Sequence, residues 1–115
     1  MPKLDDAERL AHMLDYARMA QSVSTGRTRE HLDTDTLFSL GVVRALEVVG
    51  EAANRVSPAG RQRLPNIPWP KIIGLRNRIV HGYDLLDRDV IWGIISNDLQ
   101  PLIAELEKAV QPERP

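Results

Sequence analysis

The sequence contains no cysteine, so disulfide bonds and metal sites built on thiolates are excluded. No stretch approaches the ~20 apolar residues that a membrane-spanning helix needs, and residues 1–6 lack the pattern of a signal peptide. A phosphate-binding glycine loop, a zinc-ligand spacing, a Ser–His–Asp order, internal repeats and low-complexity tracts are also missing. We therefore expect a soluble, cytoplasmic protein with no metal ion and no cofactor.

Acidic residues are missing from one long segment of the chain. The net charge is −1, which argues against a protein that coats nucleic acid without selectivity. Residues 52–83 nevertheless carry six basic side chains and no acidic one, whereas the other 83 residues carry 9 basic and 16 acidic side chains. A phosphate-bearing ligand would be attracted to this segment, although its arginines could also simply decorate a polar loop. The six are Arg55, Arg61, Arg63, Lys71, Arg76 and Arg78.

The spacing of apolar residues is helical throughout, and no strand is predicted. It predicts helices over about residues 5–22, 36–56, 69–82 and 87–110, with Asp5 or Asp6 capping the first and Asp87 the last. A connector with three prolines, residues 64–70, separates the middle two. Gly82 is expected to end the third helix, and Pro101 to kink the fourth. The expected fold is all-α, an antiparallel up-and-down bundle of four main helices with short helical turns.

The 115 residues suffice for one domain with a real core. We expect a single domain over residues 1–115, with a disordered tail from about residue 111. Trp69 and Trp92 are expected in the core or an interface, and His12 and His31, which match no metal-ligand spacing, on the surface. The expected core positions include Leu10, Met13, Leu14, Ala17, Val42, Leu46, Val49, Ala53, Val56, Ile91, Ile94, Ile95, Leu99, Leu102, Ile103 and Leu106.

One short segment concentrates side chains suited to phosphate chemistry. Residues 76–83 read Arg-Asn-Arg-Ile-Val-His-Gly-Tyr, in a chain with three histidines and two tyrosines. Histidine can accept and donate a proton near neutral pH, and arginine presents a permanently charged planar fork that fits a phosphate. The combination predicts acid–base chemistry on a phosphodiester, for which RNA is the obvious substrate.

With these residues the chain resembles the HepT toxins, a branch of the HEPN domain superfamily. The signature of that family is an arginine, four to six residues, a histidine, any residue and a tyrosine. Arg76, His81 and Tyr83 match it with a spacing of four. The flanking residues that also match are Gly50-Glu51-Ala52, Asn54, Pro68-Trp69, Leu75-Arg76-Asn77 and Trp92, so the likeness covers about residues 10–106.

The resemblance implies an α-helical homodimer that acts as a metal-independent endoribonuclease, the toxin of a toxin–antitoxin pair. It also implies a partner, a minimal nucleotidyltransferase antitoxin that transfers AMP from ATP to the motif tyrosine, Tyr83. An AMP group there would add bulk and negative charge at the mouth of the site and exclude RNA. In the active toxin the phenol of Tyr83 could bind a phosphate oxygen or stack on a base.

RNA cleavage without a metal uses the neighbouring 2′-hydroxyl as nucleophile. His81 can supply the proton transfers, typically worth ~10²–10⁴-fold, and Arg76 can hold the non-bridging oxygens where charge develops. Residues five apart on an ideal helix lie about 140° apart around the axis. The two side chains therefore share no face unless the helix ends between them, or a two-fold dimer brings second copies to one cleft. We favour the dimer, with one histidine as base and the other as acid.

Several residues are expected to support this site. Asn77, four residues before His81, would share its helical face and orient the imidazole. Glu51, in a polar stripe with Arg44, Glu47 and Asn54, would pair with Arg76 or His81, and Gly50 would permit close helix packing. The expected contacts to the RNA backbone are Arg61, Arg63, Lys71 and Arg78.

Each motif residue also has a purely structural interpretation. His81 could bond a free carbonyl at a helix end, Arg76 could form a surface ion pair, and Tyr83 could lie in the core or a dimer interface. The alternative function is a non-catalytic helical partner and substrate of a minimal nucleotidyltransferase. A third interpretation is an orphan domain with another role in RNA processing or defence.

Overall fold

The computed structural model describes residues 5–81 and 85–110, and for His81 it describes the backbone alone. These residues are mostly helical, which confirms the all-α class. None of the described helices is long and apolar enough to cross a membrane. In chain order the elements are α1 (Asp6–Ser24), α2 (His31–Thr34), α3 (Thr36–Asn54), α4 (Pro58–Gln62), α5 (Trp69–Ile73), α6 (Leu75–Ile79), β1 (Val80–His81), β2 (Leu85–Leu86), α7 (Arg88–Gly93), the π-helical η1 (Ile94–Asp98) and α8 (Leu99–Ala109).

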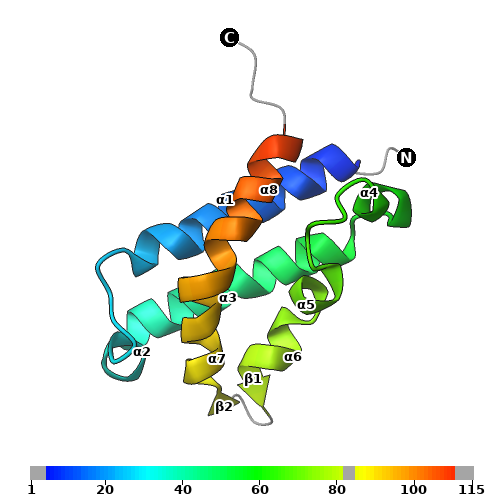
Figure 1. Ribbon diagram of the computed structural model, residues 1–115. Coiled ribbons are helices and arrows are strands. Elements are labelled where there is room, and N and C mark those ends of the chain that lie inside the picture. The colour runs from blue at the N-terminus through cyan, green and yellow to red at the C-terminus, as the bar shows by residue number, and fades with distance from the viewer. Residues whose placement is uncertain (1–4, 82–84, 111–115) are drawn as a thin grey trace.

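Two long helices, α1 and α3, run antiparallel beside each other at the centre of the bundle (Figure 1). Each begins at an aspartate whose carboxylate accepts a hydrogen bond from a free backbone N–H of the first turn. Asp5 accepts from Glu8 N–H at 3.0 Å, and Asp35 accepts from Phe38 N–H at 3.1 Å. The expected cap of the first helix at Asp5 is therefore confirmed, and both helices begin within one residue of the predicted positions.

The C-terminal arm is formed by α7, η1 and α8, with α8 packed against α1 (Figure 1). Asp87 caps the arm as predicted, accepting from Val90 N–H at 3.1 Å. A proline ring inside a regular α-helix clashes with the carbonyl four residues earlier, which here belongs to Asn97. The irregularity expected at Pro101 takes the form of the π-helical segment η1, which contains Asn97 and ends shortly before the proline.

The predicted third helix is broken, which corrects the sequence-based boundaries. The first interruption is Gly74 (φ −87°, ψ 11°), between α5 and α6. The second is the end of α6 at Ile79, where Val80 becomes extended (φ −121°, ψ 121°). Val80 and His81 then pair antiparallel with Leu86 and Leu85, a short strand pair that the helical spacing did not reveal. Cross-strand backbone hydrogen bonds replace those of a further helical turn, so the helix does not continue to Gly82.

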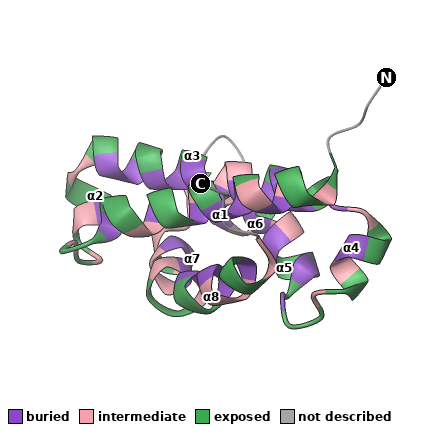
Figure 2. Ribbon diagram, turned by 90° about the horizontal axis from the view of Figure 1, so that it is seen from above, coloured by how far each residue is buried: buried purple, intermediate pink, exposed green. Residues whose placement is uncertain are grey.

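The helices enclose one hydrophobic cluster to which every helix of the bundle except α4 contributes buried apolar side chains. Figure 2 shows the buried faces of α1, α3 and α8 turned toward the interior and their exposed faces turned outward. Trp69 is buried as predicted, and its indole N–H donates to the carbonyls of Arg61 and Leu64, both at 3.1 Å. This tryptophan therefore fixes the proline-rich connector to the start of α5. Among the expected core positions, Ile95 alone is half-buried rather than buried.

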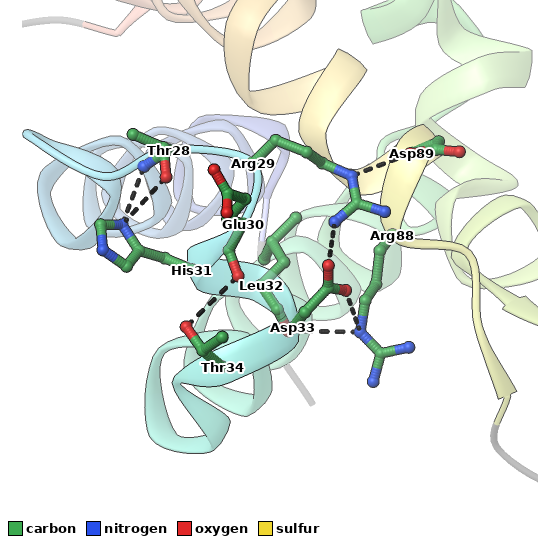
Figure 3. Close-up of polar contacts among 9 residues, drawn as sticks. All are labelled: Thr28, Arg29, Glu30, His31, Leu32, Asp33, Thr34, Arg88 and Asp89. Carbon is green, nitrogen blue, oxygen red and sulfur yellow. Dashed lines mark hydrogen bonds and ion pairs between the residues drawn. The ribbon is translucent and has the colours of Figure 1, made fainter.

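A polar network joins α2 to the start of α7, immediately after the strand pair (Figure 3). Arg29 pairs with Asp33 at 3.1 Å and with Asp89 at 2.8 Å. The guanidinium of Arg88 donates to the carbonyl of Leu32 at 3.2 Å and lies 3.4 Å from Asp33. Because Leu32 is a core residue, the network attaches the segment after the motif to the body of the bundle.

Candidate active site

Arg76, the arginine of the expected motif, lines a cleft between α3 and the broken third helix. The cleft has a volume of about 270 Å³. We refer to it as the Arg76 cleft. It is lined by Glu47, Gly50, Glu51 and Asn54 of α3, by Ile73 of α5, and by Arg76 and Asn77 of α6.

Arg76 is oriented by a carboxylate from α3. Its Nε donates to Oε2 of Glu47 at 3.3 Å, and the side chain of Glu47 is only 18% exposed whereas that of Arg76 is 64% exposed. Among the described residues, this is the only hydrogen bond that Arg76 forms. The guanidinium is therefore contacted at Nε, and its remaining N–H groups can bind a phosphate that enters the cleft.

Gly50 allows the two walls of the cleft to approach each other. A Cβ atom at this position would lie 2.9 Å from the backbone carbonyl oxygen of Ile72 and 3.6 Å from the Cβ of Leu75. The expected role of Gly50 in close helix packing is thus confirmed. This packing sets α6 against α3 at the height of Glu47 and Glu51, which lie within one turn of Gly50.

The helix that carries Arg76 ends before His81. Since α6 stops at Ile79 and His81 belongs to β1, the 140° separation of an ideal helix does not apply to this pair. One of the two arrangements that would let Arg76 and His81 converge, a helix that ends between them, is present. The break lies at Val80 rather than at Gly82. The side chain of His81, Gly82 and Tyr83 lie outside the described residues.

Two of the three expected supporting residues, Glu51 and Asn77, line the Arg76 cleft, and the third, Tyr83, lies outside the described residues. The carboxylate of Glu51 lies 3.5 Å from Arg44, whereas the partner of Arg76 is Glu47. Asn77 shares no helical face with His81, because the helix has ended. Asn77 therefore belongs to the wall beside Arg76, and its predicted role toward the imidazole of His81 falls on a side chain outside the described residues.

The sequence placed Glu47 in the polar stripe beside the site but did not predict that it pairs with Arg76. Its membership of the polar stripe on α3 was visible, because Glu47, Glu51 and Asn54 recur at spacings of three and four residues. Its pairing with Arg76 depends on how α6 packs against α3, which the sequence spacing does not specify. Glu47 also lies 3.7 Å from Arg44, so one carboxylate faces two guanidinium groups.

Two of the expected RNA contacts lie in a separate hollow. Lys71 and Arg78 line a space of about 340 Å³ between α5, the proline-rich connector and the C-terminal arm. Arg78 lies 3.9 Å from Asp98 of η1. Because residues two apart on a helix lie about 200° apart, Arg76 and Arg78 emerge on opposite sides of α6. The structure does not bring Lys71 and Arg78 into the Arg76 cleft.

The other two expected RNA contacts, Arg61 and Arg63, bind groups at the corner between α3 and α4. Arg61 donates to the carbonyl of Asn54 at 3.0 Å, and Arg63 lies 3.7 Å from Asp6. The Asp6 carboxylate also accepts from the Ser57 hydroxyl at 2.6 Å and from the Ser57 N–H at 3.0 Å. These hydrogen bonds from Ser57, with a smaller contribution from Arg63, lower the pKa of Asp6. Neither arginine lines the Arg76 cleft.

The described part of the chain offers no arrangement suited to a metal ion. No group of three or more histidine, aspartate or glutamate side chains there is placed to hold one. The polar groups that the Arg76 cleft does contain are a guanidinium, two carboxylates and two amides.

A family model described as ribonuclease HepT-like matches residues 13–109, a range that includes the whole Arg76 cleft and the motif segment. The chain belongs to the HepT-like ribonuclease family. This assignment confirms the resemblance drawn from Arg76, His81 and Tyr83 and from the flanking residues.

Three proteins illustrate the similarity of this HepT-like chain to known sequences. A candidate RNase of Methanocaldococcus jannaschii is 38% identical over 71 residues, which are 62% of this chain and 65% of that protein. A protein of Thermococcus cleftensis named probable ribonuclease HepT is 33% identical over 76 residues, 66% of this chain and 67% of its own length. A second candidate RNase of Methanocaldococcus jannaschii is 27% identical over 111 residues, 96% of this chain and 92% of that protein. No solved structure shows significant similarity to the chain.

Proposed function

We propose that this HepT-like chain is a metal-independent endoribonuclease that cleaves RNA by attack of the 2′-hydroxyl, and that it is the toxin of a toxin–antitoxin pair. The observation that carries the proposal is the guanidinium of Arg76. Its Nε donates to Glu47, and the side chain lines an open cleft five residues before His81.

In the proposed reaction, His81 removes the proton of the 2′-hydroxyl while that oxygen forms a bond to phosphorus. The bond from phosphorus to the 5′-oxygen breaks, and the leaving oxygen takes a proton from a protonated imidazole. Arg76 donates hydrogen bonds to the non-bridging oxygens as negative charge develops on them. The products are a 2′,3′-cyclic phosphate and a 5′-hydroxyl.

A homodimer completes this proposal, since it supplies one imidazole as base and a second as acid. Two large apolar side chains one turn apart on α3, Leu37 and Leu40, are 83% and 58% exposed. They lie on the same outer side of α3 as Arg44, which borders the Arg76 cleft through Glu47. A two-fold contact over this part of α3 would bring the two clefts near each other.

Cleavage assays with two single variants test the reaction. We expect Arg76→Ala and His81→Ala each to lower the cleavage rate by about 10²-fold or more, with wild-type cleavage unaffected by EDTA. Arg18→Ala, in a surface pair with Glu107 at 2.8 Å, is the control. Mass spectrometry of the wild-type products should find the cyclic phosphate. Unchanged cleavage and growth arrest in His81→Ala would instead support the non-catalytic partner.

The antitoxin is proposed to be a minimal nucleotidyltransferase that modifies Tyr83 with AMP. Incubation of the chain with the product of the neighbouring gene and ATP should add the mass of AMP to the wild type and none to Tyr83→Phe. The modified chain should no longer cleave RNA. No gain in mass on the wild-type chain would contradict this part of the proposal.

A further inference from the structure

A second hollow adjoins the Arg76 cleft on the other side of α3. It lies between α1 and α3, has a volume of about 140 Å³, and shares Glu51 with the Arg76 cleft. Its polar rim is formed by Arg9 and His12, one turn apart on α1, and by Arg55, the C-cap residue of α3. We call it the basic hollow. Val48 and Ala52 form its floor.

The basic side chains of the hollow form no ion pair with the described part of the chain. None of the ion pairs within 4.0 Å among the described residues involves Arg9, His12 or Arg55. Glu51, the only acidic side chain among the described residues that line the basic hollow, lies 3.5 Å from Arg44. Two arginines and a histidine therefore share one small space with a single carboxylate, which also faces Arg44.

Stability of the helices does not explain this grouping. Arg9 lies at the end of the first turn of α1, where the helix macrodipole disfavours a cation. Arg55 at the end of α3 is favoured by its own helix, but it lines the same hollow as Arg9. Figure 1 shows why, because the start of α1 lies near the end of α3 in the antiparallel pair. Like charges placed together raise the free energy of the folded state unless an anion binds between them.

We propose that Arg9, His12 and Arg55 bind a backbone phosphate of the RNA strand whose scissile phosphate lies at Arg76, an inference that rests on the proposed function. Glu47, which holds Arg76, and Glu51 and Arg55 follow one another on α3 at four-residue intervals. Each interval rises about 6 Å, so the step from Glu47 to Arg55 is about 12 Å along the helix. An extended strand that follows α3 would therefore place another backbone phosphate, a few nucleotides from the scissile one, at the basic hollow.

The test uses the full-length chain with the double substitution Arg9→Gln and Arg55→Gln. The control, Arg18→Gln with Lys108→Gln, removes the same charge from surface residues that pair with Glu107 and Glu105. The binding probe is a single-stranded 2′-O-methyl oligoribonucleotide of about 20 nucleotides. It keeps every phosphate and cannot be cleaved by 2′-hydroxyl attack. The cleavage probe is a dinucleotide, too short to reach the basic hollow.

We expect the Arg9/Arg55 variant to bind the oligonucleotide roughly tenfold more weakly, with a salt dependence reduced by about 0.7 per cation removed. Cleavage of the dinucleotide should match the wild type, and the melting temperature should be equal or higher, because repulsion is relieved. The control should bind like the wild type.

Three results would overturn the inference: wild-type affinity and salt dependence in the Arg9/Arg55 variant, an equal loss in the control, or a change in the sedimentation coefficient of the Arg9/Arg55 variant. The last result would assign the basic hollow to an interface between protein chains. If the wild type cleaves neither the dinucleotide nor an unmodified RNA of about 20 nucleotides, the proposed ribonuclease function fails instead. By contrast, an Arg9/Arg55 variant that cleaves the dinucleotide and binds the oligonucleotide like the wild type would refute only the role of the basic hollow.

Discussion

At the scale of single residues, the chemistry of the Arg76 cleft depends on which N–H groups of the Arg76 guanidinium are already hydrogen-bonded within the chain. Glu47 accepts a hydrogen bond from Nε of Arg76 at 3.3 Å, and Arg76 forms no other hydrogen bond with a described residue. Arg44 lies on the other side of Glu47 at 3.7 Å and also reaches Glu51 at 3.5 Å. The chain of alternating charges keeps the arginine oriented without neutralising the edge that a phosphate would contact.

Replacing Glu47 with glutamine tests this orientation. The amide is a weaker acceptor than the carboxylate, so Arg76 should be less firmly placed, and displaced catalytic groups lose up to ~10²-fold in rate. We expect kcat for RNA cleavage to fall by about tenfold. Single-turnover rates at saturating enzyme measure it, with Glu107→Gln as the control because that carboxylate pairs with Arg18 far along the chain. Equal rates for Glu47→Gln and wild type would contradict the role of Glu47.

Gly50 can be compared with a second glycine of the same helix. At Gly50 an added Cβ lies 2.9 Å from the Ile72 carbonyl oxygen, a backbone atom, whereas at Gly41 nothing lies within 4 Å. We expect Gly50→Ala to destabilise the fold by about 1–3 kcal/mol through overpacking. Gly41→Ala should stabilise it by about 0.5–1 kcal/mol through helix propensity. Urea unfolding of both variants decides, and shifts of the same sign would refute the close approach of α3 and α5.

At the scale of elements, two features determine the backbone of the motif segment. The helix α6 ends before His81, and contacts hold the strand pair and α7 in place. The end of α6 at Ile79 is stabilised by the Val80–Leu86 pairing and by the hydrogen bond from Asp87 N–H to the Ile79 carbonyl at 2.9 Å. Beyond the strand pair, the network of Arg29, Asp33, Arg88 and Asp89 fixes α7 to α2 (Figure 3). The segment that carries His81 is therefore anchored at both of its described ends.

At the corner between α3 and α4, the contact of the Asp6 carboxylate with Ser57 depends on pH. The pKa of Asp6 is lowered in the folded chain, chiefly by the hydrogen bonds from Ser57, relative to its ordinary value of 3.8. A lowered folded pKa gives stability that is fully present above the unfolded value and is lost as the pH falls through the folded value. We expect Asp6→Asn to reduce the free energy of unfolding at pH 6 and to differ progressively less from wild type below about pH 4.

Urea unfolding at several pH values measures this convergence. Asp35→Asn provides a second case. The pKa of Asp35 is also lowered, mainly by the hydrogen bond from the Phe38 N–H and to a smaller extent by the hydrogen bond from Arg27. A gap between wild type and Asp6→Asn that widens on acidification would show that the sign is wrong.

At the scale of the whole molecule, the basic segment of the sequence does not form one surface. Its members divide between the Arg76 cleft, the hollow with Lys71 and Arg78, the α3–α4 corner with Arg61 and Arg63, and the basic hollow with Arg55. The other cations of the basic hollow come from α1, more than 60 residues from Arg76 in sequence. Packing of α1 against α3, rather than position in the sequence, determines which cations surround the proposed RNA path.

The proposed dimer predicts that two inactive variants can complement each other. If one cleft receives Arg76 and His81 from both subunits, a mixed dimer of Arg76→Ala and His81→Ala still contains one arginine and one histidine there. We expect mixing and subunit exchange to restore a measurable fraction of the wild-type rate, while each variant alone stays inactive. Sedimentation confirms the assembly in the same samples. No recovery despite demonstrated exchange would contradict a shared cleft.

The sequence by itself determined the helical class, the cap at Asp87, the choice of Asp5 or Asp6 for the first cap, the buried stripes and the family motif, because these depend on spacing within one segment or on residue type. Only the tertiary structure decided the end of α6 at Ile79, the pairing of Arg76 with Glu47 and the opposite placement of Arg78. A strand pair, an ion pair between helices and a basic hollow all depend on contacts between separate elements. Local periodicity contains no information about those contacts, and packing alone fixes them.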